Sequence, residues 1–368
     1  MTELAKITPD LVQRLTAEAE TALSILLPID TAVRDVRAPE ALLRNLLRRA
    51  EEVLEQRGLD HEQREALLAP ARLFATEADF SSHRAPGLAI FSNGAMSDVV
   101  SLTESPPELA AAGRVFHIKP LLPALARIRR FHCLAVSADR AQLFSGTPHD
   151  WAEVSLSVPS IDVVVTSGGT RGDKDAERRG KQRDVVLAEY LQPIAATAAS
   201  RLGDDPAPLV LVAAPEIAGH FPTTRITQPM LRLEMNPFAV PEDELWRRAA
   251  DLVGSGIEAE IDDAIGRVEA RLNAEESTAS RRPEEILIAA YEGRVDTVLV
   301  AADAELWGQF NMGQTIRADR IQGEGDEDLL NLAAVMTLRQ GGRAFAVPRD
   351  RLPLSSAYGT EAAALMRY

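Results

Sequence analysis

The sequence predicts an α/β protein with mixed α and β elements in three domains, and three observations lead to this prediction. The chain has 368 residues, which is enough for two or three domains of ordinary size. Hydrophobic residues make up 46 % of it, so each domain can bury a substantial core. Apolar residues at helical spacing alternate with short apolar runs typical of strands. Grouped in order, these elements predict domains over residues 1–112, 113–278 and 279–368.

The first domain is expected to mix helices and strands. Thr8 can accept a hydrogen bond from an exposed backbone N–H, and Pro9 suits the first helical position, so a helix is predicted to begin there. Gly58 is placed to end a second helix, whose leucines lie close to a 3.6-residue period. The expected helices span residues 8–22, 39–54 and 60–74, and the expected strands span 23–29, 88–91 and 99–102.

The central domain is expected to hold a mixed β-sheet with a projecting loop over residues 167–183. That loop is polar and contains glycines, and a helix follows it. Leu187, Leu191 and Ile194 share one face of this helix, which we expect Pro193 to kink. The expected strands span residues 131–136, 141–144, 154–158, 162–166 and 208–212, and the expected helices span 182–202 and 241–274.

The last domain is expected to be a small parallel α/β sandwich, because helices and strands alternate in it. Pro283 opens a helix, and Gly293 closes it. The stretch 308–328 is polar, and we expect it to be mobile, with the acid-rich run at residues 324–328 solvated. The expected strands span residues 296–300 and 344–347, and a further helix is expected over 327–339.

Charge and composition exclude several classes of function. The formal net charge is −15 and the pI is about 5.0, which argues against non-specific DNA or RNA binding but allows a local basic contact. The single cysteine, Cys133, excludes an intrachain disulfide and a thiolate metal cluster. No apolar run approaches the length of a membrane span, and no signal peptide is evident. We therefore expect a soluble cytoplasmic protein that binds neither DNA nor a membrane.

Motifs for common catalytic chemistry are absent from the sequence. The histidines show no paired metal-ligand spacing, and no phosphate-binding or nucleophile-elbow motif occurs. His117 is expected to cap or pack at a domain start, and His132 and Cys133 to be core residues of a strand. No catalytic residue, metal site or cofactor is therefore expected.

Three stretches, in order, resemble the archaeo-eukaryotic class I release factor family, which includes Pelota. Residues 114–122, containing Phe116-His117, are similar to the opening of the family's central domain, and the strands at 131–144 follow. Residues 285–300 resemble the start of the family's last domain, and residues 362–368 resemble its closing strand. The resemblance is to the bacterial and archaeal branch of the family.

The resemblance implies a three-domain ribosome-binding fold. Its first domain would reach toward the decoding site, and its central domain toward the peptidyl-transferase centre. Its last domain would resemble a kink-turn-binding ribosomal protein, a three-layer α/β sandwich that contacts partners such as a translational GTPase. Ribosomal RNA is then the expected ligand.

The expected loop departs from the family's Gly-Gly-Gln motif, whose glycines let the backbone enter a narrow site and whose glutamine region positions water. Here Thr170 follows Gly168-Gly169, and Lys181 separates Gly180 from Gln182. We therefore expect ribosome rescue or hibernation without ester hydrolysis. Two alternatives stay open: a peptidyl-tRNA hydrolase with Gly168, Gly169 or Gln182 near the ester, and a non-ribosomal interaction or stress module that retains the fold.

Basic residues in this loop are candidate RNA contacts. Between residues 171 and 184 there are six basic and four acidic residues, a local balance of +2. The basic side chains could contact phosphates; the alternative is a solvated loop of mixed charge. Arg44 and Arg48 could also touch RNA, or could only mark the exposed face of an amphipathic helix. The full candidate set is Gly168, Gly169, Arg171, Lys174, Arg178, Arg179, Lys181, Gln182, Arg183, Arg44 and Arg48.

Overall fold

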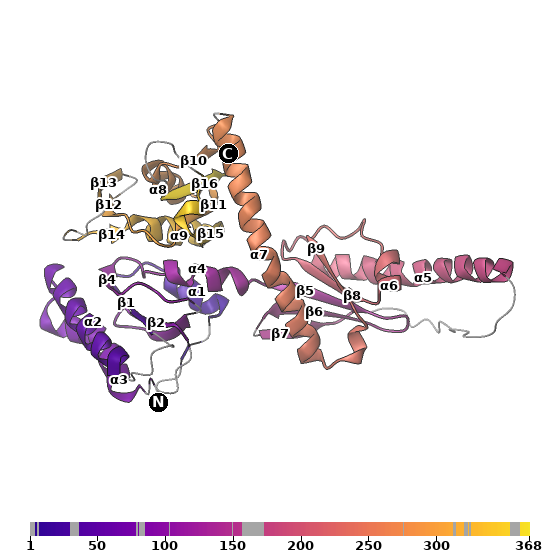
Figure 1. The fold of residues 1–368 in the computed structure, drawn as a ribbon, viewed down its shortest axis with the longest axis horizontal. Helices are drawn as coiled ribbons and strands as arrows, with labels where there is room; N and C mark the ends of the chain where they lie inside the picture. Colours follow the sequence, from indigo (N-terminus) through magenta and orange to yellow (C-terminus); the bar gives the residue numbers. More distant parts are fainter. Residues whose placement is uncertain are drawn as a thin grey trace. The chain divides into compact units, whose positions relative to one another are not determined.

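The protein is described by a computed structural model over residues 4–5, 7–29, 37–78, 80, 85–102, 104–148, 150–156, 173–274, 276–311, 314–319, 323, 325–353 and 361–368. It forms two compact units of mixed α/β structure, which confirms the predicted fold class (Figure 1). Unit 1 is Met1–Ala126 with Ala259–Tyr368, and unit 2 is Arg127–Glu258. The division into three domains at 112/113 and 278/279 stays a prediction. Among the helices described, none has both the length and the apolarity needed to cross a membrane.

The amino-terminal segment of unit 1 is built on an antiparallel sheet with the strand order β3-β2-β1-β4. The two predicted helices are present as α2 (Arg37–Gln56) and α3 (His61–Glu77), and they bury their apolar sides against this sheet. Asp60 and Gln63 form a capping box that starts α3, and Gly58 (φ 79°) makes the turn before it. The strands are β1 (Ala22–Pro28), β2 (Gly87–Ser92), β3 (Ser97–Leu102) and β4 (Leu109–Gly113).

The first helix, α1 (Pro9–Thr16), begins as predicted but ends earlier than expected. The Thr8 hydroxyl accepts a hydrogen bond from the Leu11 N–H at 3.2 Å. The prediction that this helix continues to Ala22 is wrong, because Ala22 already belongs to β1. That strand is buried and pairs with both β2 and β4, so tertiary pairing outweighs local helix propensity.

The carboxy-terminal segment of unit 1 contains a mixed sheet with the order β10-β16-β11-β15. Among the described strands of this sheet, only β11 and β15 pair in parallel, so the prediction of a parallel sheet is wrong. Strand β16 lies antiparallel beside β11, which makes the sheet mixed rather than parallel. The helices α8 (Pro283–Tyr291) and α9 (Leu329–Arg339) pack on each other, and α9 lies against β11 and β15. The strands are β10 (Ala279–Ser280), β11 (Val295–Ala301), β15 (Arg343–Val347) and β16 (Ala362–Met366).

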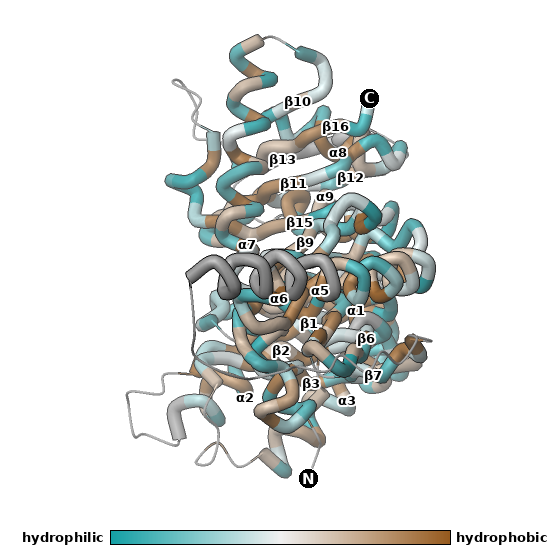
Figure 2. The backbone as a smooth tube through the Cα atoms, turned by 90° about the vertical axis from the view of Figure 1, so that its right-hand side faces the viewer, coloured by the Kyte–Doolittle hydropathy of each residue, from teal (hydrophilic) through white to brown (hydrophobic). Residues whose placement is uncertain are grey.

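A second small sheet occupies part of the stretch that was expected to be mobile. Strands β12 (Trp307–Asn311), β13 (Gln314–Asp319) and β14 (Glu327–Asp328) form it in the order β13-β12-β14. The expectation of a structureless segment is therefore wrong for these residues. Figure 2 shows hydrophobic residues gathered along strands such as β1 and β11, as expected for sheets with buried faces.

Unit 2 is a mixed sheet with helices on both faces. The strand order is β7-β6-β5-β8-β9, in which β8 is parallel to both β5 and β9, and the β5–β6 and β6–β7 pairs are antiparallel. This confirms the predicted central mixed sheet. The strands are β5 (Phe131–Val136), β6 (Ala141–Thr147), β7 (Asp150–Val154), β8 (Leu209–Ala213) and β9 (Met230–Glu234).

Alternate residues of β5 and β8 enter two different cores. Leu134 and Leu211 face α5 (Asp173–Leu202) and α6 (Pro215–His220), whereas Cys133 and Val210 face the start of α7 (Glu242–Asn273). This period of two explains why both strands read as continuous apolar runs in the sequence. On the α7 face, the Trp246 ring stacks on Phe131 with 4.1 Å between ring centroids.

The predicted loop over residues 167–183 is only partly described. Residues 167–172, with Gly168, Gly169 and Arg171, lie outside the described residues, as does the expected strand 162–166. The helix α5 begins at Asp173 rather than at Gln182, so the prediction of a loop is wrong for residues 173–183. This stretch holds good helix formers, including Lys174, Glu177, Arg178 and Arg179, which favour extending the helix toward its start.

A substitution at Gly146 tests the close packing of strands β6 and β7 in unit 2. Gly146 lies on β6 opposite Trp151 of β7, and a Cβ added there would collide with backbone atoms of Asp150 and Trp151. We therefore expect Gly146→Ala to lower the stability of unit 2 by about 1–3 kcal/mol, as overpacking does. Thermal unfolding followed by the fluorescence of Trp151 and Trp246 measures the effect.

The matched control is Gly219→Ala in α6, where a Cβ would meet nothing within 4 Å. We expect that variant to be neutral or slightly stabilising, because alanine is the better helix former. An unfolding midpoint for Gly146→Ala equal to that of the control would contradict the packing argument.

Candidate functional site

The predicted RNA contacts of the central domain fall mainly at the start of α5. Lys174, Arg178, Arg179, Lys181, Gln182 and Arg183 all belong to its first turns, and their side chains are not described. The later part of the helix is fixed to the sheet, because Tyr190, Leu191 and Ile194 are buried against β5, β6 and β8. Because its second half is buried, α5 is anchored to the sheet, and the basic first turns belong to the same helix. Contacts of defined geometry require such support.

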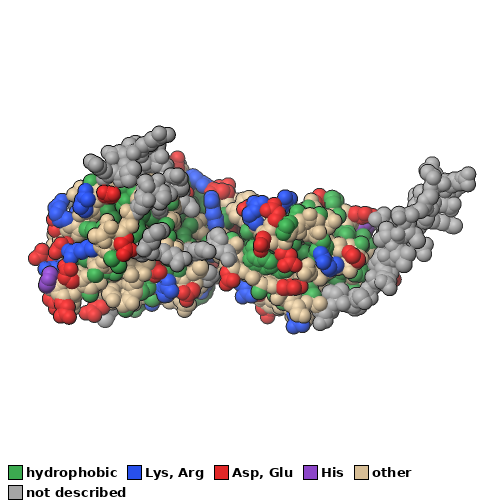
Figure 3. All heavy atoms as spheres, turned by 90° about the horizontal axis from the view of Figure 1, so that it is seen from below, with side chains coloured by type: hydrophobic (Ala, Val, Ile, Leu, Met, Phe, Trp, Pro, Cys, Tyr) green, Lys and Arg blue, Asp and Glu red, His purple; other side chains and the backbone are tan. Residues whose placement is uncertain are grey.

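Arg44 and Arg48 lie on the exposed side of α2. Their neighbours Leu43 and Leu46 are fully buried, which orients the arginines toward solvent. The Arg48 guanidinium donates to the Glu52 carboxylate at 2.8 Å, an exposed pair one helical turn apart. Acidic side chains therefore offset part of this basic face. On the face drawn in Figure 3, basic and acidic side chains are likewise interspersed.

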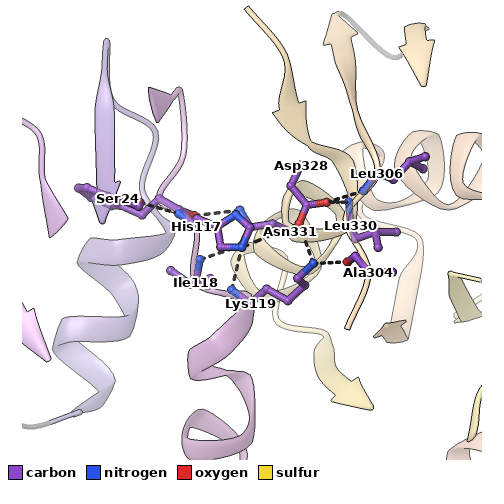
Figure 4. A network of polar contacts seen from close by, with 10 residues as sticks. Ser24, His117, Ile118, Lys119, Ala304, Leu306, Asp328, Leu330 and Asn331 are labelled. Atoms are coloured by element: carbon purple, nitrogen blue, oxygen red, sulfur yellow. Dashed lines mark hydrogen bonds and ion pairs between the residues drawn. The ribbon is translucent and has the colours of Figure 1, made fainter. Parts of the chain in front are cut away.

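A buried ion pair joins the two segments of unit 1, and sequence reasoning missed it (Figure 4). Lys119 and Asp328 are 209 residues apart, and the Lys119 Nζ lies 2.8 Å from Asp328 Oδ2. Their side chains are 2 % and 0 % exposed. Lys119 also donates to the carbonyl of Ala304, and Asp328 Oδ1 accepts from the N–H groups of Leu306 and Leu330. The pair is thus hydrogen-bonded on both sides, as a buried charge requires.

Asn331 adds backbone hydrogen bonds to the same contact between the two segments. We call this contact the joint; it consists of residues 116–119 with Asp328 and Asn331. Its Oδ1 accepts from the N–H groups of Ile118 and Lys119 at 2.8 and 3.0 Å. Its Nδ2 donates to the carbonyl of Phe116 at 2.9 Å. One amide side chain from α9 therefore binds three consecutive peptide groups around the start of η1 (Lys119–Leu121). This fixes the register between the amino-terminal and carboxy-terminal segments, because a shifted α9 would leave those buried groups unpaired.

His117 occupies the centre of the joint. Its backbone N–H donates to the Ser24 hydroxyl on β1 at 2.9 Å, and its ring is 4 % exposed. The ring Nε2 lies 3.9 Å from Asp328 Oδ2 and makes no hydrogen bond within the described residues. Burial lowers the pKa of His117 to about 4; the nearby Asp328 carboxylate partly opposes this shift, and Lys119 adds to it.

A small cavity of about 20 Å³ lies beside His117, and Ser24, Trp307 and Asp326 are among its lining residues. It has room for about one water molecule, far below the several hundred Å³ of a small-molecule site. Within the described ranges, no three His, Cys, Asp or Glu side chains are placed to hold a metal ion. The joint therefore has the geometry of a structural contact rather than of a cofactor site.

The prediction that the acid-rich run before α9 is solvated is wrong for Asp326 and Asp328, which are 2 % and 3 % exposed. For Asp328, the partner that compensates its buried charge is Lys119, which lies 209 residues away in the sequence. The prediction that His132 and Cys133 are core residues is confirmed, since both are buried. Burial raises the pKa of the Cys133 thiol to about 12, which makes it a poor nucleophile.

Comparison with known protein families gives a match to the central part of the chain. Residues 130–294 match the family described as Bacterial archaeo-eukaryotic release factor family 3. This confirms the resemblance stated from motifs, two of which, the strands at 131–144 and the start of the stretch at 285–300, lie within the matched range. No curated protein matches the chain.

Three solved structures are similar to the chain at low sequence identity. The archaeal translation termination factor aRF1 is 14 % identical, with a TM-score of 0.23, over 98 % of this chain and 99 % of that one. Dom34 of S. cerevisiae is 11 % identical, with a TM-score of 0.33, over 81 % and 78 %. Pelota of Archaeoglobus fulgidus is 10 % identical, with a TM-score of 0.30, over 76 % and 79 %.

The buried pair predicts a large effect of removing one partner. We expect Lys119→Met to destabilise unit 1 by about 3–5 kcal/mol, because it leaves the Asp328 carboxylate buried without its cation. Lys119→Met/Asp328→Asn should recover part of that loss, since asparagine is neutral and can still cap α9. Hydrogen exchange of α9 amides across a urea series measures the free energy of opening.

The control is Arg48→Gln, which removes an exposed ion pair of the same unit. Its cost should stay below about 1 kcal/mol, as for other surface pairs. A loss as small for Lys119→Met as for Arg48→Gln would show that the buried pair does not hold the segments together.

Proposed function

We propose that this protein is a ribosome-associated translation factor of the rescue or hibernation type. The match of residues 130–294 to the bacterial archaeo-eukaryotic release factor family carries the proposal. In this proposal the three domains keep the boundaries 112/113 and 278/279. The amino-terminal and carboxy-terminal domains act as one body through their shared joint, and the central domain carries the RNA-contacting stretch.

The residues after the central strands support binding without ester hydrolysis. Hydrolysis in the family needs a Gly-Gly-Gln tip, whose glycines permit close backbone approach. Gln182 instead lies within α5, after Gly180 and Lys181 of the same helix. A glutamine on a helix is not free to enter a narrow site as a loop tip is. Gly168-Gly169-Thr170 lacks the glutamine altogether.

Contact with ribosomal RNA is proposed to be local and electrostatic. The chain as a whole carries a charge of −15, so an attractive field must come from a restricted basic stretch. Residues 171–184 provide one, with a balance of +2, at the start of a helix that is fixed to the sheet at its other end. Arg44 and Arg48 are the proposed secondary contacts. Such binding must weaken steeply with salt.

A translational GTPase is the proposed class of protein partner. This extension rests on the sequence resemblance. The S. cerevisiae Dom34 is described as interacting with Hbs1, and a ribosome-bound archaeal Pelota is described together with ABCE1. The exposed parts of the carboxy-terminal segment are the surfaces available for such a contact.

Charge reversal tests the RNA contact. We expect Arg178→Glu/Arg179→Glu to weaken co-sedimentation with 70S ribosomes by at least about tenfold and to reduce the dependence of affinity on salt by roughly one power per lost phosphate contact. Adding Lys181→Glu should increase the effect. The thermal stability of unit 2 should not change, because the core residues described on α5, such as Tyr190, Leu191 and Ile194, lie further along the helix.

The matched control is Arg225→Glu/Arg232→Glu, an equal charge change at two exposed residues of unit 2. If both double variants lose affinity equally, the effect is one of net charge rather than of the α5 contact. If the wild-type protein fails to sediment with ribosomes at low salt, even with ribosomes from starved cells, the proposed function is wrong. The non-ribosomal module, which the net charge of −15 favours, then remains.

Peptide release from programmed ribosomes separates the proposal from the hydrolase alternative. We expect no release above background from the wild-type protein, and no change in Gln182→Ala. Release that Gly168→Ala/Gly169→Ala or Gln182→Ala abolishes would establish an esterase activity. The same preparation must bind ribosomes, so that a lack of release is not a lack of binding.

A further inference from the structure

His117 lies where the amino-terminal and carboxy-terminal segments of unit 1 meet (Figure 4). Its ring is buried beside a small cavity, and its Nε2 has no hydrogen-bond partner within the described residues. The backbone on both sides of the ring is held, by Ser24 at His117 itself and by Asn331 at Ile118 and Lys119. The imidazole is therefore held inside the joint while these contacts are closed, beside a cavity with room for about one water molecule.

The carboxylates around His117 already accept hydrogen bonds from other groups. The nearest carboxylate oxygen, Asp328 Oδ2, already accepts from Lys119 Nζ, and Asp328 Oδ1 accepts from two N–H groups. Asp326 is bound by Gly323 and Gln309, and Glu327 Oε1 accepts from the Arg114 N–H at 2.7 Å. The charged groups around the ring are thus Asp326, Glu327 and Asp328, with Lys119, Arg114 and the half-buried Arg57 that Glu327 and Asp326 attract.

We propose that His117 makes this joint an acid-sensitive latch: the ring gains a proton only when the two segments of unit 1 separate locally and admit water. The ammonium of Lys119 and a protonated ring would compete for one carboxylate oxygen, so the closed joint excludes the charged imidazole. Acid then favours the open joint. This inference does not depend on ribosome binding.

The direction and size of the effect follow from the difference in proton affinity between the closed and open states. In the closed joint burial lowers the pKa of His117 to about 4, whereas the open ring has its ordinary value of 6.5. The open state therefore binds more protons between these values, and the closed state loses stability as pH falls below 6.5. The opening constant should rise about tenfold from pH 7.5 to pH 5.5.

Hydrogen exchange in the full-length protein tests this directly. Protection factors of the Ile118 and Lys119 amides, which donate to Asn331, report the opening of the joint after correction for intrinsic exchange at each pH. We expect the wild-type opening constant to rise about tenfold between pH 7.5 and 5.5. In His117→Gln, which keeps a polar side chain but does not titrate, the constant should change less than about twofold.

The control is His61→Gln, because His61 is an exposed histidine on α3 of the same unit. It should keep the full tenfold dependence. A wild-type opening constant that does not change with pH would overturn the latch, as would a dependence that survives in His117→Gln or disappears in His61→Gln. Should His117→Gln not fold, NMR titration of the wild-type ring decides: a neutral ring down to near pH 4 supports the latch, and a midpoint near 6.5 in the closed protein refutes it.

Discussion

The contact on which unit 1 depends is the buried pair of Lys119 and Asp328, with Asn331 beside it. It joins segments 209 residues apart in the chain, so most of the protein lies between its two halves. Burying two charges is costly, and their attraction repays that cost only when every remaining donor and acceptor is also satisfied. Ala304, Leu306 and Leu330 provide those partners. Such a network specifies one docking arrangement more than it adds stability.

The joint gives the whole chain a simple organisation. The amino-terminal and carboxy-terminal segments of the chain form one compact unit. Residues 127–258, which connect them in the sequence, form the other. The central unit has its own cores on both faces of the sheet, one under α5 and α6 and one under the start of α7. It can therefore carry the candidate RNA-contacting stretch without drawing on the joint for stability. The candidate RNA-contacting stretch at the start of α5 and the proposed latch therefore lie in different units.

Acidity and surface charge place limits on how such a factor can bind RNA. The strongly negative chain leaves the basic start of α5 as the stretch with a positive local balance that we identified in the sequence. Elsewhere arginines are paired with carboxylates, as Arg48 is with Glu52 and Arg247 with Asp251. With so small a positive balance, such a surface would bind RNA through the placement of its basic residues more than through a long-range attractive electrostatic field. Its affinity should accordingly be sensitive to where α5 begins and how firmly its second half is held.

The sequence by itself determined the elements with strong local signals. The capped start of α1, the apolar strands β5 and β8, the long helix α7 and the family resemblance were all predicted from it, because periodicity and caps are short-range properties. Only the tertiary structure decided where α1 ends and that β16 turns a parallel sheet into a mixed one. The same holds for Lys119, Asp328 and Asn331. Each reads as an ordinary polar residue in the sequence, and its role comes from burial against partners that chain distance hides.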